Sequence, residues 1–208
     1  MTIQINGNGT ITGINVGGLP DGIVDTDMIA ANAVATAKLA DGAVTSTKST
    51  GLGGLAMADE WRVASDMGET NDTTISNWER NDTEFSQIGT GMTQSSGVFT
   101  FPANGIYKVE FYATSRRAAN QNLNVVRYRI QTSTDSGSNW NERALSSSQM
   151  ASAGDNQETF SCCSVILDVT SYSTYRLRLT VAATTHVRPL YGTNSNHTCM
   201  TFLKLGDT

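Results

Sequence analysis

Hydrophobic and polar residues alternate with a period of two along most of the chain after residue 58. In segment 105–114, Tyr107, Val109 and Phe111 fall on one side and Lys108 falls on the other. Such alternation is typical of a β-strand with one buried face. Similar patterns predict strands at 61–63, 73–78, 84–88, 97–101, 123–132, 159–169, 175–181 and 199–205.

Segments rich in Gly, Ser and Asn join these strands, and no stretch among them has the period of an amphipathic helix. We therefore predict an all-β domain over residues 59–208, built as a β-sandwich. The inward positions that we expect to form its core are Tyr107, Val109, Phe111, Tyr128, Leu167 and Leu177.

Residues 21–50 form three consecutive ten-residue repeats, each with valine at its fourth position. A unit this short cannot bury an apolar face within one chain, so we expect it to stack on other copies as a stem. Two local conformations remain open: a turn with a short segment in each repeat, or one helix over 27–40. The expected packing residues are Val24, Ile29, Val34, Leu39 and Val44.

The first twenty residues are polar and Gly-rich, with isolated isoleucines. Asn-Gly pairs at 6–7 and 8–9 lie between two short alternating stretches, which predicts a small hairpin. A Gly-rich hinge separates the repeats from the sandwich. The predicted parts are therefore an N-terminal segment (1–20), a stem (21–50), a hinge (51–58) and a C-terminal domain (59–208).

Composition narrows the range of functions. Of the residues, 38% are hydrophobic and 16% are charged, and the formal net charge is −5. A nucleic acid or an anionic membrane would need clustered Lys and Arg, so neither is expected as a partner. The chain starts without the basic and apolar regions of a signal peptide, and no apolar run approaches the ~18 residues of a membrane span. We therefore expect release by cell lysis.

The three cysteines, Cys162, Cys163 and Cys199, lack the spacing of a metal site or a disulfide framework. We expect them to be buried structural thiols made in a reducing compartment.

Segment 97–117, GVFTFPANGIYKVEFYATSRR, resembles the signature strand pair of the C1q and tumour-necrosis-factor (TNF) jelly-roll class. In that class a Gly-[Val/Ile]-Phe-Thr-x-Pro-x-x-Gly-x-Tyr run leads into an alternating strand. The matching residues are Gly97, Phe99, Pro102, Gly105, Tyr107 and Phe111. The closing segment 201–205 is similar to the last core strand of the class. The resemblance covers roughly residues 58–208 and implies a jelly-roll knob that assembles as a homotrimer.

The repeats resemble the shaft and attachment segments of bacteriophage tail and head fibres. Residues 33–34 and 38–44 match the recurring string Ala-Val-x-x-x-Lys-Leu-Ala-Asp-Gly-Ala-Val. The resemblance implies a virion protein, assembled in the host cytoplasm, whose first twenty residues dock onto capsid or tail proteins. The anchor residues would be Ile3, Ile5, Ile11 and Ile14.

Candidate catalytic chemistry is sparse. The two histidines, His186 and His197, have no recognisable partner, and neither a Gly-x-Ser-x-Gly nor a His-Glu-x-x-His motif occurs. We therefore expect no enzyme activity, no cofactor and no catalytic metal. The acidic stretch 59–84 leaves a calcium site open, with solvated surface charge as the favoured interpretation.

Three polar loops, 115–121, 133–141 and 184–197, form the candidate binding surface. Their arginine and aromatic side chains can stack on sugar rings or pair with carboxylates and phosphates. Packing between subunits is the alternative role. The candidate receptor-binding residues are Arg116, Arg117, Trp140, Arg188 and Tyr191.

We expect a homotrimeric phage fibre whose knob adheres to a host surface glycan without catalysis and gains avidity from three sites. The alternative is a capsid decoration protein that stabilises the phage head, which the shortness of the stem favours. A polysaccharide depolymerase is a third hypothesis. Neither nucleic-acid binding nor membrane insertion is expected.

Overall fold

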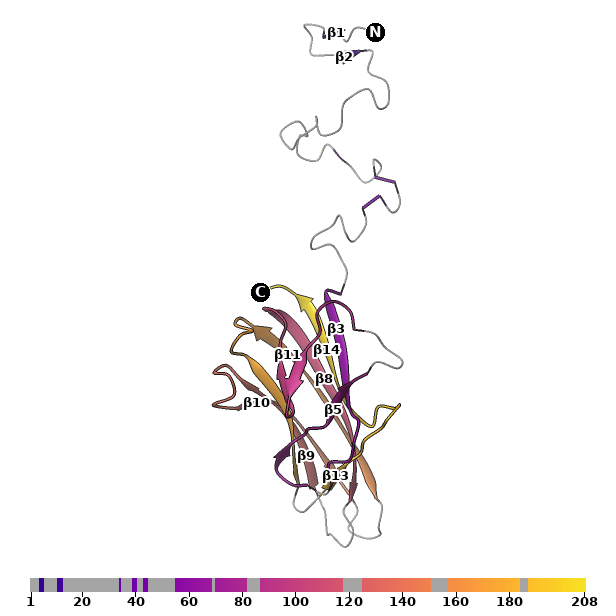
Figure 1. Ribbon diagram of the computed structural model, residues 1–208, viewed down its shortest axis with the longest axis vertical. Coiled ribbons are helices and arrows are strands. Elements are labelled where there is room, and N and C mark those ends of the chain that lie inside the picture. Colours follow the sequence, from indigo (N-terminus) through magenta and orange to yellow (C-terminus); the bar gives the residue numbers. More distant parts are fainter. Residues whose placement is uncertain are drawn as a thin grey trace. The chain divides into compact units, whose positions relative to one another are not determined.

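The computed structural model describes residues 4–5, 11–12, 34, 39–40, 43–44, 55–68, 70–81, 87–117, 125–150, 157–183 and 187–208. These residues form fourteen strands and no helix. The chain divides into two compact units, residues 1–54 and 55–208 (Figure 1). The strands are β1 (Gln4–Ile5), β2 (Ile11–Thr12), β3 (Met57–Val63), β4 (Thr73–Thr74), β5 (Trp78–Arg80), β6 (Thr93–Ser95), β7 (Val98–Thr100), β8 (Gly105–Arg117), β9 (Val125–Ser133), β10 (Asn141–Gln149), β11 (Glu158–Val169), β12 (Arg176–Ala183), β13 (Val187–Pro189) and β14 (Thr198–Gly206).

In the first unit, β1 and β2 pair antiparallel, with Gln4 opposite Thr12 and Ile5 opposite Ile11. The hairpin predicted around the Asn-Gly pairs is thus confirmed. The choice between turns and a helix over 27–40 falls mostly outside the described residues and stays a prediction.

The second unit, called here the sandwich unit, consists of two antiparallel sheets. One, the β9 sheet, has the order β10-β9-β12-β7-β6, with β4 also paired to β12. The other, the β8 sheet, has the order β11-β8-β14-β3-β5, with β13 also paired to β8. Strands distant in sequence therefore lie side by side, as in a jelly roll. The all-β sandwich fold predicted from the alternating pattern is confirmed.

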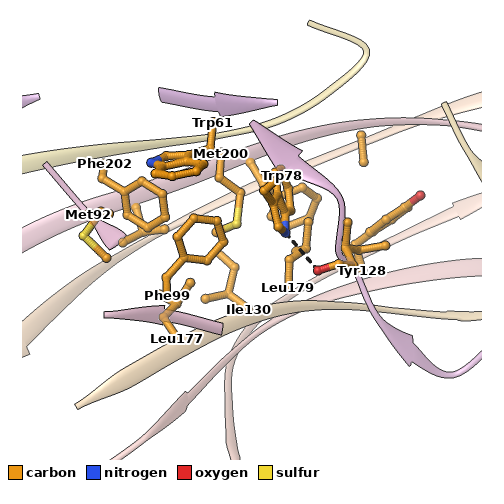
Figure 2. Close-up of a cluster of buried hydrophobic side chains, with 14 of the residues drawn as sticks. Trp61, Trp78, Met92, Phe99, Tyr128, Ile130, Leu177, Leu179, Met200 and Phe202 are labelled. Carbon is orange, nitrogen blue, oxygen red and sulfur yellow. Dashed lines mark hydrogen bonds between the residues drawn. The ribbon is translucent and has the colours of Figure 1, made fainter. Parts of the chain in front are cut away.

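The core lies between the two sheets and follows from the strand periodicity. Along β8 every second side chain from Gly105 to Arg117 is buried. Phe99 from β7 lies at the centre of an aromatic cluster, with ring centroids 5.7 Å from Trp61, 5.5 Å from Trp78 and 5.1 Å from Phe202 (Figure 2). The expected core residues Tyr107, Val109, Phe111, Tyr128, Leu167 and Leu177 are all buried.

The turn between β6 and β7 shows why one glycine of the Gly-x-Phe motif is needed. Ser96 and Gly97 have φ of 50° and 82°, the left-handed pair of a two-residue hairpin. A Cβ on Gly97 would lie 2.1 Å from the carbonyl oxygen of Ile75, so a side chain there would force the chain apart.

The single strand predicted at 73–78 is wrong. The segment contributes β4 to the β9 sheet and the start of β5 to the β8 sheet. Asn77, at φ 60°, turns the chain between them, and the Trp78 indole donates to the Ile75 carbonyl at 2.8 Å. Of the predicted strand 84–88, only residues 87 and 88 are described, and Ile88 forms an isolated bridge with Ala58.

The expectation that all three cysteines are buried is also wrong. Cys199 is buried and Cys163 is half-buried, but Cys162 is exposed. The two adjacent cysteines lie on β11, so their side chains point to opposite faces of the sheet. Burial raises the pKa of the Cys199 thiol to about 12, which keeps it protonated.

Candidate functional site

The loop between β9 and β10, residues 134–140, is held by a compact set of hydrogen bonds. The Ser133 hydroxyl donates to the Asp135 carboxylate at 2.6 Å and accepts from the Gly137 amide at 2.8 Å. Asn139 donates its backbone amide and its side-chain amide to Asp135 at 2.9 Å and 2.6 Å. The bond from Ser133, followed by those from Asn139, lowers the pKa of Asp135 to about 2. The loop conformation is therefore fixed at neutral pH.

Trp140, at the end of this loop, is held against a cation. The Arg178 guanidinium carbon lies 4.2 Å from the centroid of the indole ring. Arg178 also donates to the Gln131 side chain at 2.8 Å, and its partial burial lowers its pKa. Cation–π stacking of this kind fixes both planes. The half-buried indole thus forms a rigid aromatic platform on the outer face of the β9 sheet.

A groove of about 350 Å³ lies where the β10 edge of one sheet meets the β11 edge of the other. Its polar lining comes from Thr134, Arg143, Asp168, Thr170 and Tyr175, and three apolar residues of β11 complete it. Hydroxyls, a guanidinium and a carboxylate around a small apolar surface can hydrogen-bond to sugar hydroxyls. The groove begins in the Trp140 loop, because Thr134 belongs to both.

Arg116 and Arg188 come together at the other end of the sandwich unit. They are opposite each other on β8 and β13, and Arg116 is also opposite Glu158 on β11. Arg116 pairs with Glu158 at 2.6 Å, and Arg188 pairs with both carboxylate oxygens of Asp66. The Arg188 side chain, together with a backbone amide, lowers the pKa of Asp66. Both arginines are thus neutralised by carboxylates, which weakens their case as receptor contacts.

Arg117 is not on an exposed loop, as was expected from the sequence. Strand β8 continues through this residue, and Arg117 is only 6% exposed on the inward side. The prediction that residues 115–121 are a loop is therefore wrong for 115–117. Residues 184–197, predicted as a loop, contain β13, so Arg188 lies on a strand. Tyr191 follows that strand and is 42% exposed.

The outer face of the β8 sheet carries exposed apolar side chains on β11 and β8. Phe160 is 54% exposed and Ile166 is 65% exposed. The Tyr112 ring stacks on Phe160 with centroids 6.0 Å apart, and Cys162 is directly opposite Tyr112 on the neighbouring strand. We call Tyr112, Phe160, Cys162 and Ile166 the apolar face. Sequence reasoning assigned β11 one apolar side, although Phe160, Cys162 and Ile166 mark a second.

The stem and anchor residues are only partly described. Val34, Leu39 and Val44 are 51%, 46% and 48% exposed, so a single chain leaves these side chains largely uncovered. Ile5 and Ile11 face each other across the hairpin. The remaining predicted residues, Ile3, Ile14, Val24 and Ile29, lie outside the described residues.

Within the described part of the chain, no group of three His, Cys, Asp or Glu side chains is arranged to hold a metal ion. His197 is exposed, and His186 lies outside the described residues. The described residues also contain no helix that is long and apolar enough to cross a membrane.

No family model matches the chain, and no curated protein matches it in sequence. Among solved structures, it is similar to Eiger TNF from S. frugiperda, with a TM-score of 0.56 and 11% identity over 73% of this chain and 93% of that one. It is also similar to murine APRIL at pH 5.0, with a TM-score of 0.51 and 9% identity over 72% of this chain and 98% of that one. At such identities the likeness shows the fold, which is a TNF-like jelly roll.

Proposed function

We propose that this chain is a homotrimeric phage fibre protein whose sandwich unit adheres to host surface glycans without catalysis. Residues 1–20 would dock onto capsid or tail proteins, and residues 21–50 would form the stem. The observation that carries the proposal is the contrast between the two outer faces of the sandwich unit. The apolar face of the β8 sheet suits packing against other chains, whereas the polar face of the β9 sheet presents Trp140 to a ligand.

The homotrimer is supported by apolar surface that a single chain leaves in water. Clustered exposed apolar side chains usually mark a contact between proteins. Tyr112, Phe160 and Cys162 form such a cluster, and Ile166 lies further along β11, beyond Ser164. The stem valines at 34 and 44, each about half exposed, need partners for the same reason. The TNF-like fold and the phage-fibre resemblance of the repeats agree with assembly of three chains around a common axis.

Glycan adhesion is supported by the Trp140 platform and the neighbouring groove. An indole offers a flat apolar surface to a sugar ring at little cost in conformational entropy, because its orientation is already fixed. Weak binding by one platform is sufficient when three are linked, since each bound site raises the effective concentration of the others.

The Phe160→Glu variant tests the homotrimer. We expect the full chain to have three times its 22.2 kDa mass in light scattering. The variant should be monomeric, because packing would bury an unpaired carboxylate. Tyr172→Glu is the matched control: Tyr172 is 47% exposed in the turn between β11 and β12, away from the apolar face, and should leave the trimer intact. A monomeric wild-type protein would contradict the homotrimer, and a trimeric Phe160→Glu variant would contradict packing through the apolar face.

The Trp140→Ala variant tests adhesion. We expect its affinity for host cells to fall about tenfold or more per site, the size of effect seen for central aromatic residues of interfaces. Adsorption of fluorescently labelled full-length protein to host cells measures the effect, with Tyr172→Ala as the control for loss of an exposed aromatic ring. Adsorption of Trp140→Ala at the wild-type level would remove Trp140 from the binding site.

A capsid decoration protein is the second candidate function, favoured by a stem of only three repeats. In that case the same trimer would clamp the phage head. Electron micrographs of virions with a gold label on the sandwich unit separate the two functions. Label spread over the head supports decoration, and label at fibre tips supports the fibre.

A further inference from the structure

Four arginines occupy the outer face of the two central strands of the β9 sheet. Arg127 and Arg129 lie on β9 and Arg176 and Arg178 on β12, where the registers place them at outward positions. Their inward neighbours are buried, so the arginines point away from the core. Residues two apart on a strand are roughly 7 Å apart. We call this row the arginine strip.

The positive charge of the strip is only partly compensated. Arg129 pairs with Glu142 at 3.3 Å and with Asp72 at 3.6 Å. Over the described ranges, no carboxylate forms an ion pair with Arg127, Arg176 or Arg178. The strip therefore has more arginines than paired carboxylates, in a chain whose formal net charge is −5.

Two of these cations are held in place by neutral groups. Arg176 donates to the backbone carbonyls of Tyr175 and Ser173 at 2.8 Å and 2.9 Å. Arg178 stacks on Trp140 and donates to Gln131. Neutral partners orient a guanidinium without cancelling its charge, so both arginines remain available to an anion. The strip also passes beside the aromatic platform, because Arg178 belongs to both.

We propose that the arginine strip binds anionic polysaccharides, those whose sugars carry carboxylate or phosphate groups. The inference rests on the proposed glycan adhesion and specifies the chemistry of its ligand. Trp140 would receive a sugar ring while the arginines pair with the acidic groups along the polymer. The strip is not suited to packing between subunits, because Leu145 is the one exposed large apolar residue on this face within the described residues.

An anionic polysaccharide fits the strip better than a nucleic acid. A nucleic acid carries dense charge, so its binding needs clustered cations on a basic protein, whereas this chain is acidic. The strip presents a few cations at intervals, and its accessible neutral groups are the Trp140 ring and the side-chain amide of Gln131, next to Arg178. Such neutral groups suit sugar hydroxyls.

The test is titration calorimetry of the full-length protein with polygalacturonate, phosphomannan, neutral dextran and a single-stranded DNA oligonucleotide. The variant is Arg127→Gln/Arg129→Gln. The matched control, Arg116→Gln/Arg188→Gln, removes the same charge from the β8 sheet. Thermal melting of both double variants checks that they are folded.

We expect the wild type to bind at least one acidic polysaccharide more tightly than dextran, with affinity falling as the salt concentration rises. The strip variant should bind about tenfold more weakly, and the control should match the wild type.

Equal affinity of the strip variant and the wild type would overturn the inference. So would equal losses of affinity in the two double variants, or binding of DNA as tight as that of the acidic polysaccharides.

Failure of the inference can be distinguished from failure of the proposed function. If Arg127→Gln/Arg129→Gln leaves adsorption to host cells unchanged while Trp140→Ala abolishes it, glycan adhesion stands and the strip has no part in it. If wild-type protein does not adsorb to host cells at all, the proposed function fails.

Discussion

Replacing Phe99 with Ala is expected to lower the free energy of unfolding of the sandwich unit by about 3–5 kcal/mol. Phe99, on the β9 sheet, is fully buried and contacts three aromatic rings of the facing β8 sheet, those of Trp61, Trp78 and Phe202. Its removal leaves a cavity that these large rings cannot fill without leaving their preferred rotamers. Urea unfolding followed by circular dichroism measures the change.

Tyr191→Ala is the matched control for Phe99→Ala, because it also removes an aromatic ring but from a position that is 42% exposed. Its effect should stay within about 0.5 kcal/mol. Similar stabilities for the wild type and Phe99→Ala would mean that the aromatic cluster is not the main source of stability.

Replacing Asp59 with Ala is expected to cost about 3–5 kcal/mol, because it leaves two buried N–H donors without an acceptor and removes the carboxylate that pairs with the half-buried Arg80. Asp59 on β3 is fully buried and accepts hydrogen bonds from the Trp61 indole at 2.9 Å and the Met92 amide at 2.7 Å. It also pairs with Arg80 at 2.9 Å, and Arg80 stacks over Trp61 at 4.6 Å. One carboxylate therefore joins β3, β5 and the start of β6.

Glu158→Ala is the control for this second variant. It breaks an ion pair with Arg116 in which both side chains are about 40% exposed, and such pairs contribute less than about 1 kcal/mol. Denaturant midpoints for the two variants should therefore differ clearly. An Asp59→Ala variant as stable as Glu158→Ala would contradict the stabilising role assigned to the Asp59 carboxylate.

Much of the sandwich could be predicted from period-two alternation, because its central strands have one solvent-exposed face and one buried face. Strand β8 satisfies that condition over its whole length, and β12 satisfies it over residues 176–179. The same rule, extended by three residues beyond 114, would have placed Arg117 inward on β8, since it follows Ala113 and Ser115 on the buried side. Because Arg117 is charged, it was not recognised as an inward residue, and the strand was predicted to end too early.

Strand β10 was missed for a different physical reason. Its inward positions are Ala144, Ser146 and Ser148, which are only half-buried at the edge of the sheet. Without large apolar residues it shows no hydrophobic period, and its existence depends on pairing with β9. Neither the β-propensity of its residues nor their hydrophobic pattern could therefore predict β10, because this strand forms through its pairing with β9.

Of the candidate binding residues, Trp140 could be found from its place in a polar loop, but its partners could not. Arg178 is 38 residues further along the chain and meets Trp140 only because β12 lies beside β9. The arginine strip likewise exists only in the folded sheet. In the sequence, Arg127 and Arg129 and Arg176 and Arg178 are two separate outward pairs, and the register of β9 with β12 brings them together.

The pairing of β3 with β14 bears on how the sandwich unit would carry a mechanical load. The chain enters the unit at β3, whose residues Met57 to Arg62 are opposite Lys204 to Cys199. A pull on residue 55 directed along β3 would load these ladder bonds in shear, so that they resist together instead of opening one after another. For a particle tethered to a cell through this protein, tension entering at residue 55 would therefore act first on the β8 sheet, in the direction in which its β3–β14 bonds have to break together.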